Sequence, residues 1–371
     1  MDATQVLEST GTPAGRLRHW RIRTVVGRLL LMFTSLILTL TLLEGVLRFA
    51  GWPAPGLQVN GQGPIALRQP GRNGGAFPPS SAGRLRHYDY DVAWVVNEDG
   101  FRERSIYPKR AGEWRIGVLG DSFAAGYGVN LQERFADVCY RQLQSHHPNI
   151  SFWNLSSPLC GTKCQAEMLE GVGRDYDLDE LILVFYGGND LQDNLDSYRN
   201  PAKQDPYGDL SVSERAKIWL REHSRLATFV WINGIRAVAS FRPPGLYSRT
   251  ELDQYWPYTA SALAQLKSST GPKRLSILYL PALPEWDDTT WKQIRDQLKV
   301  QDDGRFLVKQ ALRTWAQQQN IRFVDSTSWL KHCMSSQDCT FKTDGHLNSK
   351  GHLIIGTELA KAWSAENPLD K

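Results

Sequence analysis

The sequence has little net charge for its length. Its 43 Lys and Arg residues and 39 Asp and Glu residues leave a formal charge of +4 over 371 residues, and many arginines lie near the N-terminus. Proteins that bind nucleic acid usually carry a basic surface that neutralises phosphates. We therefore expect no nucleic-acid partner. With 41% hydrophobic and 22% charged residues, the chain has the composition of a globular protein with a large core.

Cysteine is scarce, with five in the chain. Four of them lie in two local pairs, Cys160 with Cys164 and Cys333 with Cys339, and neither pair has the C-x2-C spacing typical of zinc sites. A zinc site is therefore the weaker alternative, and we expect no metal and no other cofactor. In an oxidising compartment each pair can form a disulfide. Cys139 lies in an apolar periodic stretch, which indicates a buried free thiol.

No small-residue cleavage motif follows the N-terminal apolar run. The run covers residues 29–43 and extends to 25–47, close to the roughly 20 residues that a membrane-spanning helix needs. A cleaved signal peptide is the alternative, but its apolar core is usually shorter and is followed by an A-x-A site. We therefore expect an uncleaved anchor at 25–47. Arginines before it predict that residues 1–24 are cytoplasmic, so the chain would be a single-pass inner-membrane protein with its remainder in the periplasm.

The rest of the chain changes composition near residue 114. Residues 51–81 are rich in Gly, Pro, Asn and Gln, which predicts a linker, and we assign 48–113 to a linker and lead-in segment. From 114 to 371, short apolar runs alternate with longer amphipathic ones, and no internal repeat is present. The predicted strands are 115–119, 152–155, 181–186, 275–280 and 321–324, and the predicted helices are 132–145, 163–173, 254–267, 305–319 and 351–364. This alternation predicts a three-layer α/β/α sandwich with a mostly parallel sheet and its site at the carboxyl ends of the strands.

Polar motifs follow two of these predicted strands and precede the last helix. The sequence GDSF occupies 120–123, GGND occupies 187–190, and TDGHLN occupies 343–348. The motifs bring a hydroxyl, an amide, a carboxylate and an imidazole to loops expected at one edge of the sheet. A serine hydroxyl is a weak nucleophile at neutral pH and needs a base such as histidine to accept its proton. The three motifs together predict nucleophilic catalysis.

These motifs resemble those of the SGNH, or GDSL-type, hydrolase family. GDSFAAGYG at 120–128, GGND and DGHLN are similar to three of its blocks, in the same order, and the likeness extends over about 114–364. The segment NEDGFR at 97–102 also resembles a lead-in of exported bacterial members. The resemblance implies a flavodoxin-like sandwich in which Ser122 is the nucleophile, His346 its base and Asp344 the group that orients the imidazole.

The resemblance also implies an oxyanion hole and shows two departures. The N–H of Ser122, the N–H of Gly161 and the side-chain amide of Asn189 would donate to the oxyanion. The second block, NLSSPLCGT at 154–162, has Leu159 where an ungapped match places glycine, and either Leu159 or Gly161 could supply the N–H. One residue separates Asp344 from His346 instead of the usual two, a spacing that resembles the branch that acetylates exported polysaccharides.

Several residues of the motifs also have simpler interpretations. Ser122 could cap the helix after its turn, and Asn189 with Asp190 could be ordinary turn residues. We expect Asp121 to support the loop by hydrogen bonding. His352 lies at the start of the predicted last helix, and we expect a structural role for it.

The function we predict is a serine esterase that removes acyl groups, acetyl in the first place, from an envelope glycan or lipid through an acyl-enzyme. One alternative is an O-acetyltransferase acting on an exported polysaccharide, and another is a carbohydrate-binding protein without activity. The expected partners are this acylated substrate, the membrane through the N-terminal helix, and envelope polysaccharide machinery. A helical insertion at about 191–258 is expected to form a flap beside the cleft, or else to pack on the domain's flank or on the bilayer surface.

Overall fold

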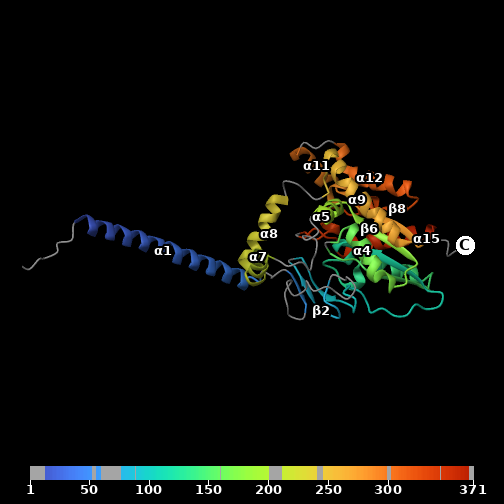
Figure 1. Cartoon of the computed structure of the whole chain (residues 1–371), viewed down its shortest axis with the longest axis horizontal. Coiled ribbons are helices and arrows are strands. Elements are labelled where there is room, and N and C mark those ends of the chain that lie inside the picture. Colours follow the sequence, from blue (N-terminus) through green and yellow to red (C-terminus); the bar gives the residue numbers. More distant parts are fainter. Residues whose placement is uncertain are drawn as a thin grey trace, which may run out of the picture.

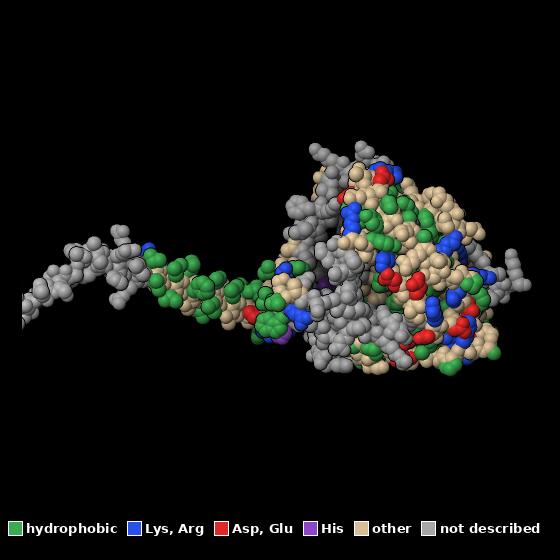
Figure 2. All heavy atoms as spheres, in the orientation of Figure 1, with side chains coloured by type: hydrophobic (Ala, Val, Ile, Leu, Met, Phe, Trp, Pro, Cys, Tyr) green, Lys and Arg blue, Asp and Glu red, His purple; other side chains and the backbone are tan. Residues whose placement is uncertain are grey.

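A long helix leads into a folded body (Figure 1). The computed structural model describes residues 13–51, 56–59, 77–87, 89–158, 160–199, 211–239, 245–298, 302–342 and 344–366. Helix α1 (Pro13–Phe49) projects from the body, and its part from Val25 to Phe49 is apolar and exposed (Figure 2). This part is long and apolar enough to cross a membrane, a property that signal sequences share. Residues 1–12 of the expected basic segment lie outside the described residues.

The segment expected to be a linker and lead-in, 48–113, contains a small antiparallel sheet. It comprises β1 (Gly56–Val59), β2 (Ala82–Arg86) and β3 (Asp91–Val95), in the order β1-β2-β3. Alternation along β3 buries Val92 and Trp94, which pack with Phe77. The composition of 51–81 predicted a linker and did not reveal β1, whereas β2 and β3 lie in the lead-in part of the segment, for which no strands were predicted. Each strand is only four or five residues long, so the alternation of apolar and polar residues along it is brief. Among the surrounding Gly, Pro and Arg residues this alternation is too short to predict a strand.

The body is built on a parallel sheet with the strand order β5-β4-β6-β7-β8. Its strands are β4 (Trp114–Leu119), β5 (Ile150–Asn154), β6 (Glu180–Tyr186), β7 (Arg274–Leu280) and β8 (Arg322–Asp325). All five were predicted, because strands covered on both faces show as continuous apolar runs. The chain builds outward from β4 to β5 and then crosses back to β6, so the order reverses between β4 and β6. Ligands of open α/β sheets bind at such a switch point.

Helices cover both faces of this sheet, which confirms the three-layer sandwich. Helices α3 (Phe135–Gln144) and α15 (Ser349–Glu366) pack together, and buried residues of both join one hydrophobic core with β4 and β5. The opposite core contains buried residues of α4 (Thr162–Gly171), α9 (Arg249–Thr270) and α12 (Leu307–Gln318). These five helices correspond to the five predicted from amphipathic spacing.

The predicted insertion is helical. It contains α5 (Asp190–Arg199), α7 (Val212–His223), α8 (Arg225–Ala239) and the first turns of α9. Figure 1 shows α7 and α8 at the end of α1, between that helix and the body.

The remaining helical segments are short connections: α2 (Ser122–Ala125), η2 (Leu131–Glu133), η3 (Val172–Arg174), α10 (Leu283–Trp286), α11 (Asp288–Leu298), η4 (Asp302–Phe306), α13 (Thr327–Leu330) and α14 (Ser336–Cys339).

Both predicted disulfides are confirmed. Cys160 is bonded to Cys164 and Cys333 to Cys339, while Cys139 is a buried free thiol. The first bond ties α4 to the loop that precedes it, and the second closes the loop before the DGHLN motif. In the part of the chain that the structure describes, no group of His, Cys, Asp and Glu side chains is arranged to hold a metal ion.

Candidate active site

Ser122 lies in a tight turn between the end of β4 and α2. Asp121 is the N-cap of α2, because its carboxylate oxygen accepts a hydrogen bond from the N–H of Phe123 at 2.9 Å. Asp121 thus supports the loop as expected, and the interpretation of Ser122 as the cap is wrong. The helix ends after one turn at Gly126, whose φ of 75° lies in the left-handed region that favours glycine. The turn therefore leaves the Ser122 hydroxyl available for another partner.

That partner is His346. The Oγ of Ser122 lies 2.7 Å from Nε2 of His346, although 224 residues separate the two in the sequence. On the other side of the ring, Nδ1 lies 3.0 Å from Oδ1 of Asp344. The rings of Phe123 and Tyr127 lie 4.6 and 5.5 Å from the imidazole, measured between centroids. A hydroxyl, an imidazole and a carboxylate thus form one continuous series, which allows proton transfer from the serine to the histidine.

Asp344 is held by further hydrogen bonds. Its second oxygen accepts one from the hydroxyl of Tyr90 at 2.7 Å, and its backbone N–H donates to Asp89 at 3.0 Å. Burial favours the protonated form of Asp344, but the close contact with His346 and the hydrogen bond from Tyr90 outweigh it and hold the pKa below its ordinary value. The side chain is therefore a carboxylate near neutral pH. Burial and this carboxylate raise the pKa of Tyr90, so its hydroxyl stays protonated and donates.

Tyr90 and Asp89 come from the turn between β2 and β3, in the segment assigned as linker and lead-in. The Tyr90 ring also packs on Phe341, 4.8 Å away between centroids, in the loop that leads to Asp344. The two residues approach Asp344 across more than 250 positions of sequence. No spacing pattern connects them with the DGHLN motif, so only the fold reveals the contact.

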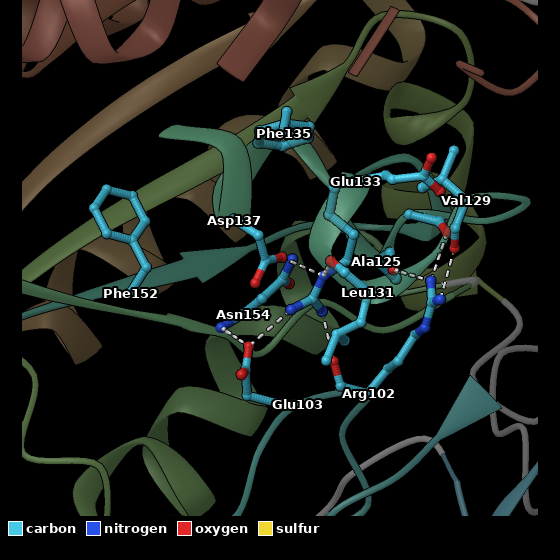
Figure 3. A network of polar contacts seen from close by, with 12 residues as sticks. Arg102, Glu103, Ala125, Val129, Leu131, Glu133, Phe135, Asp137, Phe152 and Asn154 are labelled. Atoms are coloured by element: carbon cyan, nitrogen blue, oxygen red, sulfur yellow. Dashed lines mark hydrogen bonds and ion pairs between the residues drawn. The ribbon is translucent and has the colours of Figure 1, made fainter. Parts of the chain in front are cut away.

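The lead-in motif NEDGFR also contacts the serine turn (Figure 3). The guanidinium of Arg102 donates to the carbonyls of Gly126 at 2.6 Å and Val129 at 2.6 Å. Arg134 donates to the carbonyl of Arg102 and pairs with Glu103 at 3.0 Å. All three charged side chains are buried, where hydrogen bonds to charged groups are strong. The lead-in segment therefore fixes the backbone that follows Ser122.

The expected oxyanion donors lie around the same strand ends. Asn189 is in the turn after β6, next to β4 in the sheet, and its side chain favours the charged form of the buried Asp121 carboxylate. Gly161 directly precedes α4, and a Cβ at this position would press on Asp193 and Asn194 of α5. Close packing thus explains glycine at this position. Leu159, the other candidate of the second block, lies outside the described residues.

The acidic residue after Asn189 is buried beneath this turn. Asp190 accepts a hydrogen bond from the N–H of Tyr186 at 2.9 Å, and burial raises its pKa well above the ordinary value. Burial, with the charges of Asp121 and Asp196, also raises the pKa of Asp193 to about 7. The contact of Asp190 supports its interpretation as a turn residue.

His352 has a structural role, as predicted. It is buried in α15, its Nδ1 accepts a hydrogen bond from the N–H of Phe135 at 3.2 Å, and its ring stacks on the Phe135 ring. Burial, together with the charges of Arg102, His346 and Arg134, lowers the pKa of His352 to about 3. The ring is therefore neutral and ties α3 to α15.

A small hollow lies next to residues that flank Ser122 and His346 in the sequence, although Ser122, Asp344 and His346 do not line it. Its walls include Phe123, which packs on His346, and Gly345, which lies between Asp344 and His346. Tyr186, Leu283 and Trp286 also line it. The hollow has a volume of about 20 Å³, which is room for a group about the size of one water molecule.

Comparison with known proteins identifies the family. The model of the GDSL-like lipase/acylhydrolase family matches residues 118–354, which include all three motifs. No curated protein sequence matches the chain significantly.

Solved structures that match the chain have low sequence identity to it. The lipase/acylhydrolase from Enterococcus faecalis is 13% identical, with a TM-score of 0.40 over 68% of this chain and 96% of that one. The psychrotrophic esterase EstA from Pseudoalteromonas sp. is 13% identical, with a TM-score of 0.38 over 68% and 99%. A carbohydrate esterase family 2 enzyme from Corynascus thermopiles is 14% identical, with a TM-score of 0.40 over 70% and 68%. With the family model matching well over half of its length, the chain belongs to the GDSL-like lipase/acylhydrolase family of serine hydrolases.

Proposed function

We propose that the protein is a serine esterase that works through an acyl-enzyme, with Ser122 as nucleophile, His346 as general base and Asp344 as the residue that orients the imidazole. The observation that carries the proposal is the 2.7 Å contact between Ser122 Oγ and His346 Nε2. As the serine oxygen attacks the ester carbonyl, Nε2 takes its proton and then gives it to the leaving alcohol. Water, activated by the same imidazole, releases the acyl group and restores the serine.

The tetrahedral intermediate carries a negative oxygen that needs donors. We assign these to the N–H groups of Ser122 and Gly161 and to the side-chain amide of Asn189. Support comes from their positions at the ends of neighbouring strands and before α4, at the switch point of the sheet. Each such donor typically stabilises the transition state by about 2.7–4 kcal/mol.

The acyl group that we propose is acetyl. This proposal rests on the single residue between Asp344 and His346, a spacing that resembles the branch that handles acetyl groups. The hollow lined by Phe123 and Gly345 has room for about one methyl-sized group, whereas a long acyl chain needs an extended apolar channel. Hydrolysis of p-nitrophenyl acetate should therefore be much faster than hydrolysis of p-nitrophenyl octanoate, measured as kcat/KM. Equal rates for the two esters would refute the acetyl assignment without affecting that of Ser122.

The alcohol that we propose belongs to an envelope glycan or lipid, because the apolar part of α1 suits a membrane anchor. In this scheme residues 1–24 are cytoplasmic, 25–47 span the inner membrane and 114–371 form the periplasmic catalytic domain. The sheet of the lead-in segment belongs functionally to that domain, because Tyr90 contacts Asp344.

An O-acetyltransferase is the second candidate, favoured by the single residue between Asp344 and His346. Both reactions pass through the same acyl-enzyme and differ in whether water or a sugar hydroxyl accepts the acetyl group. Acetate release, measured with and without an acceptor glycan, separates the two candidates. With a transferase, addition of the glycan should lower the amount of acetate released, and the glycan should become acetylated. A carbohydrate-binding protein without activity would release no acetate at all, and the close contact of Ser122 with His346 is an argument against it.

The membrane topology gives a first prediction. A C-terminal fusion of alkaline phosphatase after Lys371 should be active, because the arginines in the first turns of α1, before its apolar part, favour a cytoplasmic N-terminus. The protein should also stay with the membrane on carbonate extraction and keep its full mass. An inactive phosphatase together with a fluorescent cytoplasmic reporter would reject the orientation, and release of a shortened protein would show that α1 is a cleaved signal.

Tyr90 gives a second prediction. Tyr90→Phe keeps the ring that packs on Phe341 but removes the hydroxyl that donates to Asp344. Because Tyr90 acts through Asp344 on the imidazole, we expect kcat to fall roughly tenfold with little change in KM, as for the loss of one hydrogen bond to a charged group. Tyr176→Phe is the matched control, since its hydroxyl donates to the buried Asp99 at 3.1 Å instead. Equal losses of kcat in both variants would indicate a merely structural role for Tyr90.

A further inference from the structure

Helices α7 and α8 of the insertion are attached to the end of α1. The carboxylate of Glu44 accepts hydrogen bonds from Ser224 Oγ at 2.9 Å and from the N–H groups of Arg225 and Leu226 at 3.0 and 2.9 Å. Arg48 pairs with Glu44 at 2.8 Å and also donates to the carbonyl of His223 at 2.7 Å. Glu44 thus caps the N-terminus of α8, while Arg48 binds the last residue of α7.

The side of α8 that faces α1 is apolar. Leu226, Ala227, Val230 and Trp231 line a groove against α1, together with Leu40. The positions 226, 227, 230 and 231 share one face of a helix. Val230 remains 62% exposed and Trp231 46% exposed. Figure 2 shows hydrophobic side chains that continue from α1 onto the helices at its end.

This apolar surface is not confined to α8. Trp219 and Leu220 of α7 are 56% and 49% exposed, and no charged residue occurs from 226 to 235. Soluble proteins rarely expose large contiguous apolar patches, and such patches mark contact with a membrane or a partner. The groove of about 660 Å³ has Lys217 and Arg48 at its edge, and cations beside an apolar face suit anionic lipid headgroups.

The length of α1 places these contacts at membrane depth. Its charge-free part, residues 29–43, is only about 22 Å long at 1.5 Å per residue, whereas the hydrocarbon core is about 30 Å thick. If α1 spans the membrane with Phe49 at the surface, Glu44 lies about 8 Å and Leu40 about 14 Å further in, by the same rise per residue. Interfacial amphipathic helices lie about 5–10 Å deep. The start of α8, which contacts Glu44 and lines a groove with Leu40, therefore reaches lipid in this arrangement.

The capping of Glu44 agrees with this depth. An ionisable side chain near the membrane interior is costly unless it is paired or hydrogen-bonded. Three donors from 224–226 and the guanidinium of Arg48 supply these partners. Figure 1 shows α8 running crosswise to α1, which places α8 along the membrane plane when α1 crosses the bilayer.

We propose that α7 and α8 form an interfacial platform, docked on α1 through Glu44, whose apolar face lies among the headgroups and outer acyl segments of the bilayer. The proposal rests on the membrane anchor proposed above. The chain enters the insertion through α5, which begins directly after Asn189, and returns at Gly245, which packs on the Gly187–Gly188 backbone. Both ends of the insertion thus meet the candidate oxyanion turn, and the platform holds this turn near the membrane surface.

The platform can be tested with the full chain in vesicles of phosphatidylethanolamine and phosphatidylglycerol that contain a spin-labelled lipid quencher. Single cysteines, introduced by Val230→Cys in α8, Leu36→Cys in α1 and Lys361→Cys in α15, are labelled with an environment-sensitive fluorophore, since the native Cys139 is buried. We expect strong lipid quenching at 230 and 36 and none at 361, whose side chain is 66% exposed in the parent protein. Hydrolysis of soluble p-nitrophenyl acetate reports that each labelled protein is folded.

The outcomes separate the platform from the anchor. Quenching at 36 but not at 230 would overturn the platform while the anchor stands, and the apolar face would then be a protein interface. No quenching at either position would overturn the anchor and the platform with it. In a Glu44→Leu background, which removes the acceptor but keeps an apolar span, quenching at 230 should be lost and quenching at 36 kept. Full quenching at 230 in that background would overturn docking through Glu44.

Discussion

Ser122→Ala is expected to lower turnover of p-nitrophenyl acetate on the order of 10⁴–10⁶-fold, because it removes the only atom proposed to attack the ester. His346→Ala should have a similar effect, since Ser122 Oγ lies 2.7 Å from His346 Nε2 and needs it as a base. The double variant should lose little more than either single variant. Residues that act as one unit are strongly non-additive, and initial rates of the three variants measure this directly.

Two controls accompany this prediction. His352→Gln keeps an acceptor for the N–H of Phe135 and should retain most activity, because the neutral His352 ties α3 to α15. Asn189→Ala should reduce turnover by about 10²–10³, the usual effect of losing one oxyanion donor, and leave the nucleophile in place. The Ser122 assignment is wrong if a fluorophosphonate probe labels wild type and Ser122→Ala equally. An essential His352 with a dispensable His346 would reject the choice of base.

Asp344→Asn is expected to have the second largest effect, a loss of roughly 10³–10⁴-fold in kcat. In the wild type, Asp344 Oδ1 lies 3.0 Å from His346 Nδ1. This contact favours the tautomer with the proton on Nδ1, which leaves Nε2 free to take the serine proton. An amide nitrogen at this place would favour the opposite tautomer of the imidazole. The thermal unfolding midpoint, measured beside kcat, should change far less than the rate.

The neighbouring Asp89→Asn is the matched control for Asp344→Asn. Asp89 accepts a hydrogen bond from the backbone N–H of Asp344 and so holds the loop instead of the imidazole. Its amide variant retains an acceptor oxygen and should reduce kcat far less. Comparable losses in the two variants would show that loop position, rather than the tautomer, accounts for the effect.

The central sheet could be predicted because each of its strands is buried on both faces. A run such as Leu181–Tyr186 has to be apolar along its whole length, and this signal is visible without tertiary information. The residues Ser122, Asp344 and His346 could be predicted as neighbours for a related reason. Loops at the carboxyl ends of parallel strands meet at one edge of the sheet, so the order of the motifs is enough to bring their side chains near each other.

The lead-in sheet and its role could not be predicted. Tyr90 contacts Asp344 from a turn between two five-residue strands, and the contact depends on how β2 and β3 pack against the body. Arg102 belongs to the NEDGFR motif, but the sequence did not predict that it is buried and donates to the carbonyls that follow Ser122. Local propensity carries no information on such long-range pairing.

The sequence predicted a helical insertion but did not decide where the insertion lies. Its amphipathic pattern is compatible with a flap, a flank helix or a surface helix, because each buries one apolar face. The contact of Glu44 with the start of α8 joins positions 180 residues apart, so it is set by tertiary structure alone.

The central claim is that hydrolysis passes through an acyl group on Ser122, and mass spectrometry of enzyme quenched during turnover of p-nitrophenyl acetate tests it most directly. We predict one added acetyl group, located on the peptide that contains Ser122, which disappears when the substrate is exhausted. Hydrolysis without any acetylated intermediate, or with the acetyl group on another residue in both wild type and Ser122→Ala, would contradict the account.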